Sequence, residues 1–233
     1  MRNKYKIFCI YISIFLFFSN NLANSDQSFT YEAQQIEILE GGNTIKGENE
    51  VKITIADNIT ITANKLEYNR SSQLVKLTGN IKLEDKVNKI TLNTNELFYL
   101  KSKDKIFSET KTNFVFNDNY FAETKSFVFF PVQKRLSSKD QVEIYDDLGN
   151  LFSINEFEYA IDKKTFRGLN TRFIDLEKNE FLISNTMINL ETNQIFGKDL
   201  KINFNKASFG NLENDPRLKA RSFVNKDGVT SIN

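Results

Sequence analysis

The chain of 233 residues contains no histidine, no tryptophan and a single cysteine. Without histidine it cannot form a Ser-His-Asp or Cys-His catalytic site, or a zinc site with histidine ligands. Its 31 basic residues nearly balance its 30 acidic residues. Because both signs are interleaved along the sequence, no basic patch is available to bind nucleic acid phosphates. Most of the usual catalytic sites are therefore excluded, and we expect no nucleic acid partner.

The first 25 residues have the layout of a secretory signal peptide. Arg2, Lys4 and Lys6 precede an apolar run from Ile7 to Phe18, and small polar residues follow it. This run falls short of the ~20 residues that cross a bilayer, so a cleaved signal is favoured over an uncleaved membrane anchor. The single cysteine, Cys9, lies inside the run and would leave with it. We therefore predict an exported protein without thiols or disulfides.

A repeat of about 30 residues organises the rest of the sequence. One series of mostly large apolar residues recurs at intervals of 30 or 31 residues: Ile36, Leu66, Leu97, Phe127, Phe157 and Met187. A second series follows each of these by 17 residues: Ile53, Leu83, Phe114, Ile144, Ile174 and Phe204. A fixed period of this length is typical of stacked supersecondary units.

Each half of the repeat has the alternation of a β-strand. In the segment Leu74 to Asp85, Val75 and Leu77 alternate with Lys76 and Thr78, which predicts one apolar and one polar face. Polar clusters separate such segments and predict tight turns. We expect about twelve strands joined by short hairpins, with almost no helix.

Three architectures suit uniform antiparallel hairpins: a membrane barrel, a closed soluble barrel and an elongated two-sheet jelly roll. The absence of tryptophan argues against the aromatic girdles of a membrane barrel. Because a repeated hairpin extends a sheet along one axis, we predict an all-β, elongated antiparallel β-jelly roll. We expect a signal peptide over residues 1–25, the jelly roll over 26–210 and a junction or tail over 211–233. The pattern leaves open whether the apolar interior is a packed core or a groove.

Several segments resemble the OstA-like repeats of lipopolysaccharide-transport proteins, including the LptA and LptD families. They are the segments Asn43 to Val51 (NTIKGENEV), Ala63 to Tyr68 (ANKLEY), Leu77 to Leu83 (LTGNIKL) and Ala122 to Phe127. Near the end, Phe209 to Asn211 and then Asn214 to Ser222 (NDPRLKARS) look like the junction between the periplasmic jelly roll and the membrane barrel of LptD proteins. Those proteins continue into a large barrel, whereas this sequence ends eleven residues after Ser222. The sequence leaves two possibilities open: a truncated or split assembly protein, and a free-standing periplasmic relative.

The resemblance implies a V-shaped jelly roll without enzyme activity or cofactors, whose apolar groove shields lipopolysaccharide acyl chains in the periplasm, at the outer membrane. Partners would be lipopolysaccharide, other jelly rolls of this kind that add strands to the edges near Phe29 to Leu39 and Ile195 to Phe204, and a separate outer-membrane barrel. Candidate lipid-binding residues are the repeat positions and their inward neighbours: Leu66, Tyr68, Leu83, Leu97, Tyr99, Phe114, Phe116, Phe127, Phe129, Ile144, Phe157, Tyr159, Ile174, Met187 and Phe204.

Other functions need fewer features of the sequence. A secreted structural β-solenoid or adhesin-like protein needs the repeats but no groove, and a small outer-membrane β-barrel needs only the hairpins. An enzyme is the weakest alternative. Its only candidate group, the adjacent Asp146 and Asp147, lies in a DDLGN segment that reads as an ordinary turn.

Overall fold

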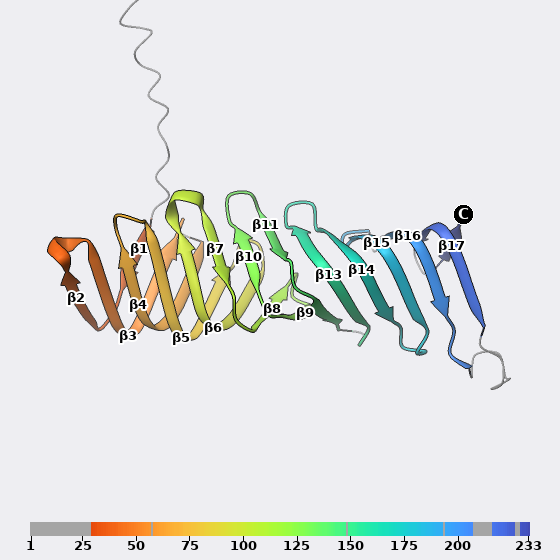
Figure 1. The fold of residues 1–233 in the computed structure, drawn as a ribbon, viewed down its shortest axis with the longest axis horizontal. Coiled ribbons are helices and arrows are strands. Elements are labelled where there is room, and N and C mark those ends of the chain that lie inside the picture. Colours follow the sequence, from red (N-terminus) through yellow and green to blue (C-terminus); the bar gives the residue numbers. More distant parts are fainter. Residues whose placement is uncertain (1–28, 57, 148, 193, 207–215, 227–228) are drawn as a thin grey trace, which may run out of the picture.

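The protein is described here from a computed structural model, which places residues 29–56, 58–147, 149–192, 194–206, 216–226 and 229–233. The expected signal peptide lies outside these residues, as do residues 26–28 and 207–210 of the expected jelly roll and residues 211–215 of the expected junction. The described strands follow one another along a long axis, from β2 at one end to β17 at the other (Figure 1). The predicted elongated, antiparallel β-jelly roll is confirmed.

Eighteen strands and two short 3-10 helices make up the described fold, and the strands belong to one antiparallel sheet. The elements are β1 (Phe29–Glu32), β2 (Gln35–Leu39), η1 (Glu40–Gly42), β3 (Thr44–Ile55), β4 (Ile59–Asn69), β5 (Leu74–Asp85), β6 (Ile90–Leu100), η2 (Lys101–Lys103), β7 (Lys105–Ser108), β8 (Thr112–Phe116), β9 (Tyr120–Thr124), β10 (Phe127–Phe130), β11 (Arg135–Ser138), β12 (Val142–Asp146), β13 (Leu151–Ala160), β14 (Thr165–Ile174), β15 (Glu180–Asn189), β16 (Gln194–Asn203), β17 (Arg217–Lys226) and β18 (Val229–Ile232).

Each long strand bends near its middle, and the bends of neighbouring strands form a continuous line, the crease. Left-handed backbone at Asn49, Asn80, Asn170 and Asp199 marks it, and the strand register slips at several of these bends. Asn and Asp adopt this conformation more readily than most residues. One layer of the jelly roll holds β2, β7, β10 and β11, and the other holds β1, β8, β9 and β12. Each long strand places one half in each layer.

The number of strands differs from the expected twelve because some bends are complete breaks. In the middle of the chain β6 pairs with β7 through one half and with β8 through the other. β7 and β8 are therefore the two halves of one bent strand. The same is true of β9 and β10, and of β11 and β12. The alternation of apolar and polar residues continues through such a break, so the sequence pattern does not reveal the break.

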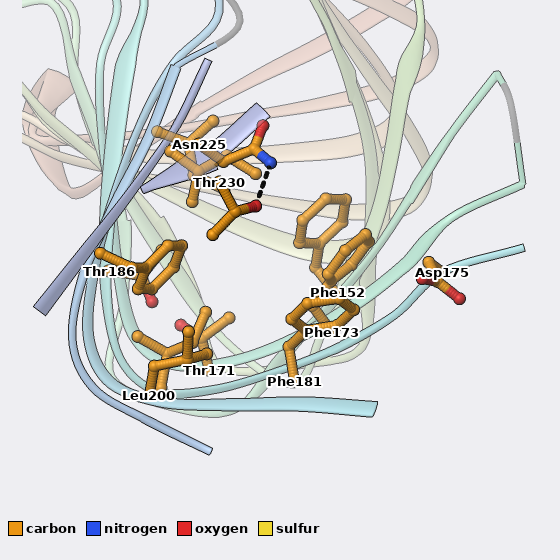
Figure 2. A pocket seen from close by; sticks show the side chains of 13 residues that line it. Phe152, Thr171, Phe173, Asp175, Phe181, Thr186, Leu200, Asn225 and Thr230 are labelled. Carbon is orange, nitrogen blue, oxygen red and sulfur yellow. Dashed lines mark hydrogen bonds between the residues drawn. The ribbon is translucent and has the colours of Figure 1, made fainter. Parts of the chain in front are cut away.

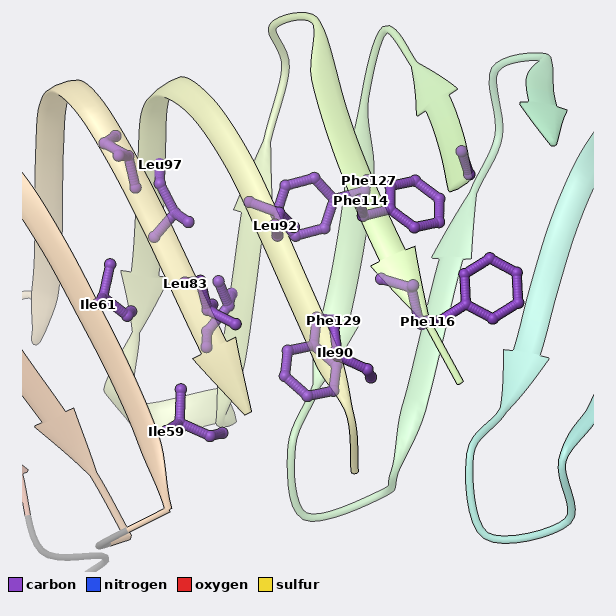
Figure 3. Close-up of a cluster of buried hydrophobic side chains, with 14 of the residues drawn as sticks. Ile59, Ile61, Leu83, Ile90, Leu92, Leu97, Phe114, Phe116, Phe127 and Phe129 are labelled. Atoms are coloured by element: carbon purple, nitrogen blue, oxygen red, sulfur yellow. The ribbon is translucent and has the colours of Figure 1, made fainter. Parts of the chain in front are cut away.

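The two layers enclose one apolar core along most of the long axis. Inward residues of neighbouring strands stand directly opposite one another, as in the row of Leu66, Leu77 and Leu97. Figure 3 shows how the aliphatic side chains of β4 to β6 give way to phenylalanine rings on β8 and β10. Burying one such side chain contributes about 1.5–3 kcal/mol to stability. Lys76 and Lys82 lie on the outer face, as predicted, in partly exposed ion pairs that contribute little.

Small hydroxyl side chains line the inside of the crease in the middle of the molecule. The Thr94 and Ser108 hydroxyls lie 3.3 Å apart, and those of Thr124 and Ser138 lie 3.0 Å apart. Each pair joins a residue beside the crease in the layer of β8 and β9, said here to lie below it, to a residue beside the crease in the layer of β7 and β11, above it, on the adjacent strand. Because buried hydroxyls cost free energy unless they are bonded, these pairs satisfy one another where the backbone bends.

One repeat further along, the same two positions hold Ile154 and Gly168. A Cβ atom on Gly168 would lie 1.9 Å from the Cγ2 atom of Ile154, which is fully buried. The β-branched isoleucine has few alternative rotamers with which to move aside. Glycine is therefore required at position 168 because isoleucine occupies position 154.

Converting this pair to the Thr124–Ser138 type tests that explanation. Gly168→Ser alone is expected to destabilise the protein by about 1–3 kcal/mol through overpacking. With Ile154→Thr present as well, the hydroxyl pair can form, so the double variant should be more stable than the two single effects predict, by about 0.5–3 kcal/mol. Urea unfolding of the four proteins measures this coupling. Additive effects would show that Ile154 does not impose the glycine.

Two expectations about edges and faces are wrong. The segment Ile195 to Phe204 is not an edge, because β16 pairs with β15 on one side and with β17 on the other. Ile174 and Met187 do not face inward. Their neighbours Phe173 and Thr186 take the inward positions, and Met187 stands opposite Arg167 and Phe196 on the outer face.

The reversed face has a simple cause in the spacing of the repeat. Inward residues Leu97, Phe127 and Phe157 are 30 residues apart, but the next inward residue, Thr186, follows Phe157 by 29. The missing residue is at the crease of β14, where two residues separate the inward Gly168 and Thr171, whereas three separate Ser138 and Val142 one repeat earlier. In a strand, a shift of one residue moves every side chain to the opposite face.

Candidate functional site: an apolar cavity at the C-terminal end

The apolar interior is not packed solid at its C-terminal end. A cavity of about 330 Å³ lies between the layers formed by β13 to β18. Its lining is mostly apolar, with five polar side chains: Phe152, Thr171, Phe173, Asp175, Phe181, Ile183, Thr186, Ile188, Ile195, Leu200, Phe223, Asn225 and Thr230. In Figure 2, Phe152, Phe173 and Phe181 form one wall, and Thr171, Thr186 and Leu200 lie across the space from them.

Three aromatic rings on neighbouring strands build the first wall. Phe152 stands opposite Phe173, which stands opposite Phe181, so β13, β14 and β15 each contribute one ring. The ring centroids are 4.6 Å and 5.2 Å apart. Phe152 is buried, but Phe173 and Phe181 are only partly buried. The aromatic row therefore passes from the packed core to a surface that a ligand can reach.

The cavity exists because large side chains are missing from one row of inward residues. In earlier repeats this row places phenylalanine beside serine, as where Phe127 pairs with Ser108 and Phe157 pairs with Ser138. The next position that should be large is Thr186, and its partners on both sides are Gly168 and Gly197. Thr186 leaves that space open, whereas Ile154 fills the space over Gly168, and Phe223 and Ile183 fill the space over Gly197. At the far side of Gly197 the row resumes with Phe223.

Polar atoms around the cavity are mostly engaged elsewhere. The Asn225 amide donates to the Thr230 hydroxyl at 2.8 Å. The Asp175 carboxylate accepts hydrogen bonds from the Asn179 backbone and side chain at 2.8 Å and 2.9 Å. Nearby on the outer face, hydrogen bonds from Arg172 and Asn203 lower the pKa of Glu180, which stays ionised there. The interior of the cavity thus suits an uncharged, largely apolar ligand.

Among the described residues, no group of three or more Asp, Glu, His or Cys side chains is arranged to hold a metal ion. No helix within the described ranges has the length and apolarity of a membrane span.

Comparisons with known proteins place the chain in a family. The sequence model of the OstA-like protein family matches residues 20–147, just over half of the chain. The chain belongs to the OstA-like family. This agrees with the resemblance to lipopolysaccharide-transport proteins seen in the repeats. No curated protein matches the chain.

Among solved structures, this OstA-like chain is similar to LptH of Pseudomonas aeruginosa, which is described as the LptA homologous periplasmic component of the conserved lipopolysaccharide transport device. The two share 12% sequence identity, and the TM-score is 0.39. The match covers 45% of this chain and 76% of LptH.

Most residues that the sequence marks as lipid-binding candidates lie in the packed part of the OstA-like core. Twelve of them point inward there, and all but one of these are almost completely buried: Leu66, Leu83, Leu97, Tyr99, Phe114, Phe116, Phe127, Phe129, Ile144, Phe157 and Tyr159, with Tyr68 partly buried. Burial raises the pKa of the Tyr159 hydroxyl to about 12, and the neighbouring Tyr120 adds to this shift. These side chains contact one another and not an open space.

The remaining candidates lie near the cavity but do not line it. Phe204 packs, partly buried, against the small cluster of Ile183, Leu200, Ile202 and Phe223. Ile174 and Met187 lie on the outer face.

None of the residues that line the cavity is among the candidates from the sequence; those missed include Phe152, Phe173 and Phe181, together with Thr171 and Thr186. Phe173 is one residue from the predicted Ile174, and Thr186 is one residue from Met187. The small residue Thr186, at a position where the earlier repeats have phenylalanine, is the signal that could have located the cavity, once the shorter spacing was recognised.

Proposed function

We propose that this OstA-like protein is a non-enzymatic periplasmic carrier module that shields lipopolysaccharide acyl chains during their transport to, and assembly at, the outer membrane. The observation that carries the proposal is the open C-terminal cavity, where the continuous inward apolar face of the jelly roll becomes accessible. Membership of the OstA-like family supports the type of cargo.

The energetics of burial suit this role. A cavity of about 330 Å³ is at the lower end of the range for small-molecule sites, roughly 300–1,000 Å³. Burying an acyl chain recovers about 0.8 kcal/mol per CH₂ group, so even half of a twelve-carbon chain contributes about 5 kcal/mol before ordering costs. This is enough to hold a lipid reversibly without covalent chemistry.

The packed core sets a limit on how far a chain can enter. Between the layers of β3 to β13 the inward side chains fill the interior, so an acyl chain could advance only if the two layers moved apart. The cavity is therefore the proposed resting place of the cargo, and passage further along would need energy supplied by another component.

Both ends of the jelly roll carry features of a docking surface for other proteins of this kind. On β2, Ile36 and Ile38 are exposed, and among the described residues this strand pairs only with β3. At the other end Val229 and Ile232 of β18 are exposed, and this strand pairs only with β17 within the described ranges. Exposed edge strands with apolar side chains favour the addition of a strand from another protein. We include this contact in the proposal.

Photo-crosslinking tests whether the cavity holds the cargo. A photoreactive amino acid at Phe173 or Phe181 is expected to label lipopolysaccharide when the protein is exposed to it in cells. The same probe at Arg172, which directly precedes Phe173 in sequence but lies on the exposed outer face, is the matched control and should not label it.

Probes at Leu97 and Phe127 test the packed region. Weak or no labelling is expected at both positions because each side chain is buried in the core. Labelling at Arg172 without labelling at Phe173 or Phe181 would contradict the carrier proposal. Absence of labelling at every position would favour a structural protein of the same fold.

A further inference from the structure

Two hydroxyl groups in the wall of the cavity are buried without a hydrogen-bond partner among the described residues. They belong to Thr171 on β14 and Thr186 on β15. Thr171 is 1% exposed and Thr186 is 4% exposed, and both line the cavity. A buried hydroxyl without a partner costs about 1–3 kcal/mol, so such groups are rare in folded proteins unless they have a use.

These threonines face one another across the crease in the same way as the bonded hydroxyl pairs, but on the alternate strands of the repeat. Thr171 lies just below the crease and Thr186 just above it on the next strand, as Thr94 and Ser108 do. In the middle of the molecule such hydroxyls bond to one another or to backbone carbonyls. Only in the cavity wall do both members of a crease pair lack partners within the described residues.

Chance does not explain polar residues at both positions. The two preceding repeats place Thr112 with Phe127 and Val142 with Phe157 at the equivalent positions, so large apolar residues are compatible with this part of the fold. Valine would have the same shape as threonine and no unpaired hydroxyl. Both side chains line the cavity, where a bound ligand could supply the missing hydrogen-bond partners.

We propose that Thr171 and Thr186 form a hydrogen-bonding subsite that recognises an oxygen substituent, a hydroxyl group or its ester, on an aliphatic chain bound in the cavity. This inference rests on the proposed function and adds chemical selectivity to it. A threonine hydroxyl can both donate and accept, so two of them can satisfy a hydroxyl substituent completely, whereas a plain alkyl chain leaves both unpaired.

The size of the preference follows from the cost of unpaired groups. One net hydrogen bond contributes about 0.5–1.5 kcal/mol, which corresponds to roughly a two- to tenfold change in affinity. With two threonines engaged, 3-hydroxytetradecanoic acid should bind at least about fivefold more tightly than tetradecanoic acid.

Competition binding against a fluorescent fatty acid tests the subsite with these two acids as probes. The proteins compared are the full chain, Thr171→Val, Thr186→Val and the double variant. Thr165→Val serves as the matched control, because its hydroxyl donates to the Lys163 carbonyl outside the cavity. The preference for the hydroxy acid is expected to fall in each cavity variant, to disappear in the double variant and to persist in the control.

Thermal unfolding supplies a second test, because the subsite and a purely structural role of the hydroxyls predict opposite changes in the Tm of the valine variants. Because valine removes an unpaired buried hydroxyl, each cavity variant should raise the Tm, by about 2–4 °C per kcal/mol of unfolding free energy gained. A fall in Tm would show that the hydroxyls stabilise the fold, and it would overturn the proposal.

The binding outcomes separate the subsite from the carrier function. Equal binding of both acids to the full chain overturns the subsite and leaves the carrier function standing. A preference that survives in the double variant also overturns the subsite. If neither acid binds, both the subsite and the proposed function fail.

Discussion

Replacing Phe116 with alanine is expected to destabilise the protein by about 3–5 kcal/mol, the typical cost of truncating a buried aromatic side chain. Phe116 is completely buried at the centre of an aromatic cluster. Its ring centroid lies 4.9 Å from that of Tyr159 and 5.3 Å from that of Tyr120. Since rings from both layers of the jelly roll meet there, surrounding side chains cannot close the space that alanine would leave.

Urea unfolding followed by circular dichroism measures this effect. Phe121→Ala is the control from the same part of the sheet, because Phe121 lies on β9 with 51% of its surface exposed, and it should change stability by less than about 0.5 kcal/mol. Equal effects of the two substitutions would show that the layers do not meet at Phe116. The interior there would then be open rather than packed.

Thr186→Phe is expected to abolish binding of acyl chains while leaving the protein folded. The substitution restores the large residue that the same row carries at Phe127 and Phe157. The room for a ring is the cavity that Thr186 lines, because Ile154 already fills the space over Gly168 and Phe223 fills the space over Gly197. The ring would occupy the cavity of about 330 Å³ and exclude the ligand.

Competition against a fluorescent fatty acid measures the loss, which should reach at least about a hundredfold if half of a twelve-carbon chain loses its burial. Met187→Phe is the matched control, because the adjacent side chain lies on the outer face, and it should bind as the unmodified protein does. Retained binding by Thr186→Phe, with the fold intact, would show that acyl chains bind elsewhere.

The fold could be predicted from the sequence because its strongest signals are local and repeated. Alternation in segments such as Leu74 to Asp85 specifies which side chains face inward, and the period of about 30 residues specifies stacked hairpins. The OstA-like segments led to the family that the comparison confirmed. What the alternation could not indicate is that bent strands break into β7 to β12, because the inward positions continue across the crease.

The site was harder to predict, and the reason is a single residue of spacing. Extending the earlier interval past Phe157 gives Met187, but the inward residue is Thr186. Moreover, the sequence does not distinguish a large apolar residue that packs against another side chain from one that borders a cavity. The distinction here comes from Thr186, which is small where the earlier repeats have phenylalanine, and a search for large apolar residues does not select it.

The crease also determines in which direction the molecule can deform. The hydrogen bonds of the strand ladders join each strand to its neighbours along the long axis, so stretching the protein lengthwise would break them. Rotating one layer away from the other about the crease separates side chains and leaves those ladders in place. The protein is thus stiff along the crease and compliant across it, so a ligand held between the layers, as proposed above, would leave sideways at a lower energetic cost than by unravelling the end.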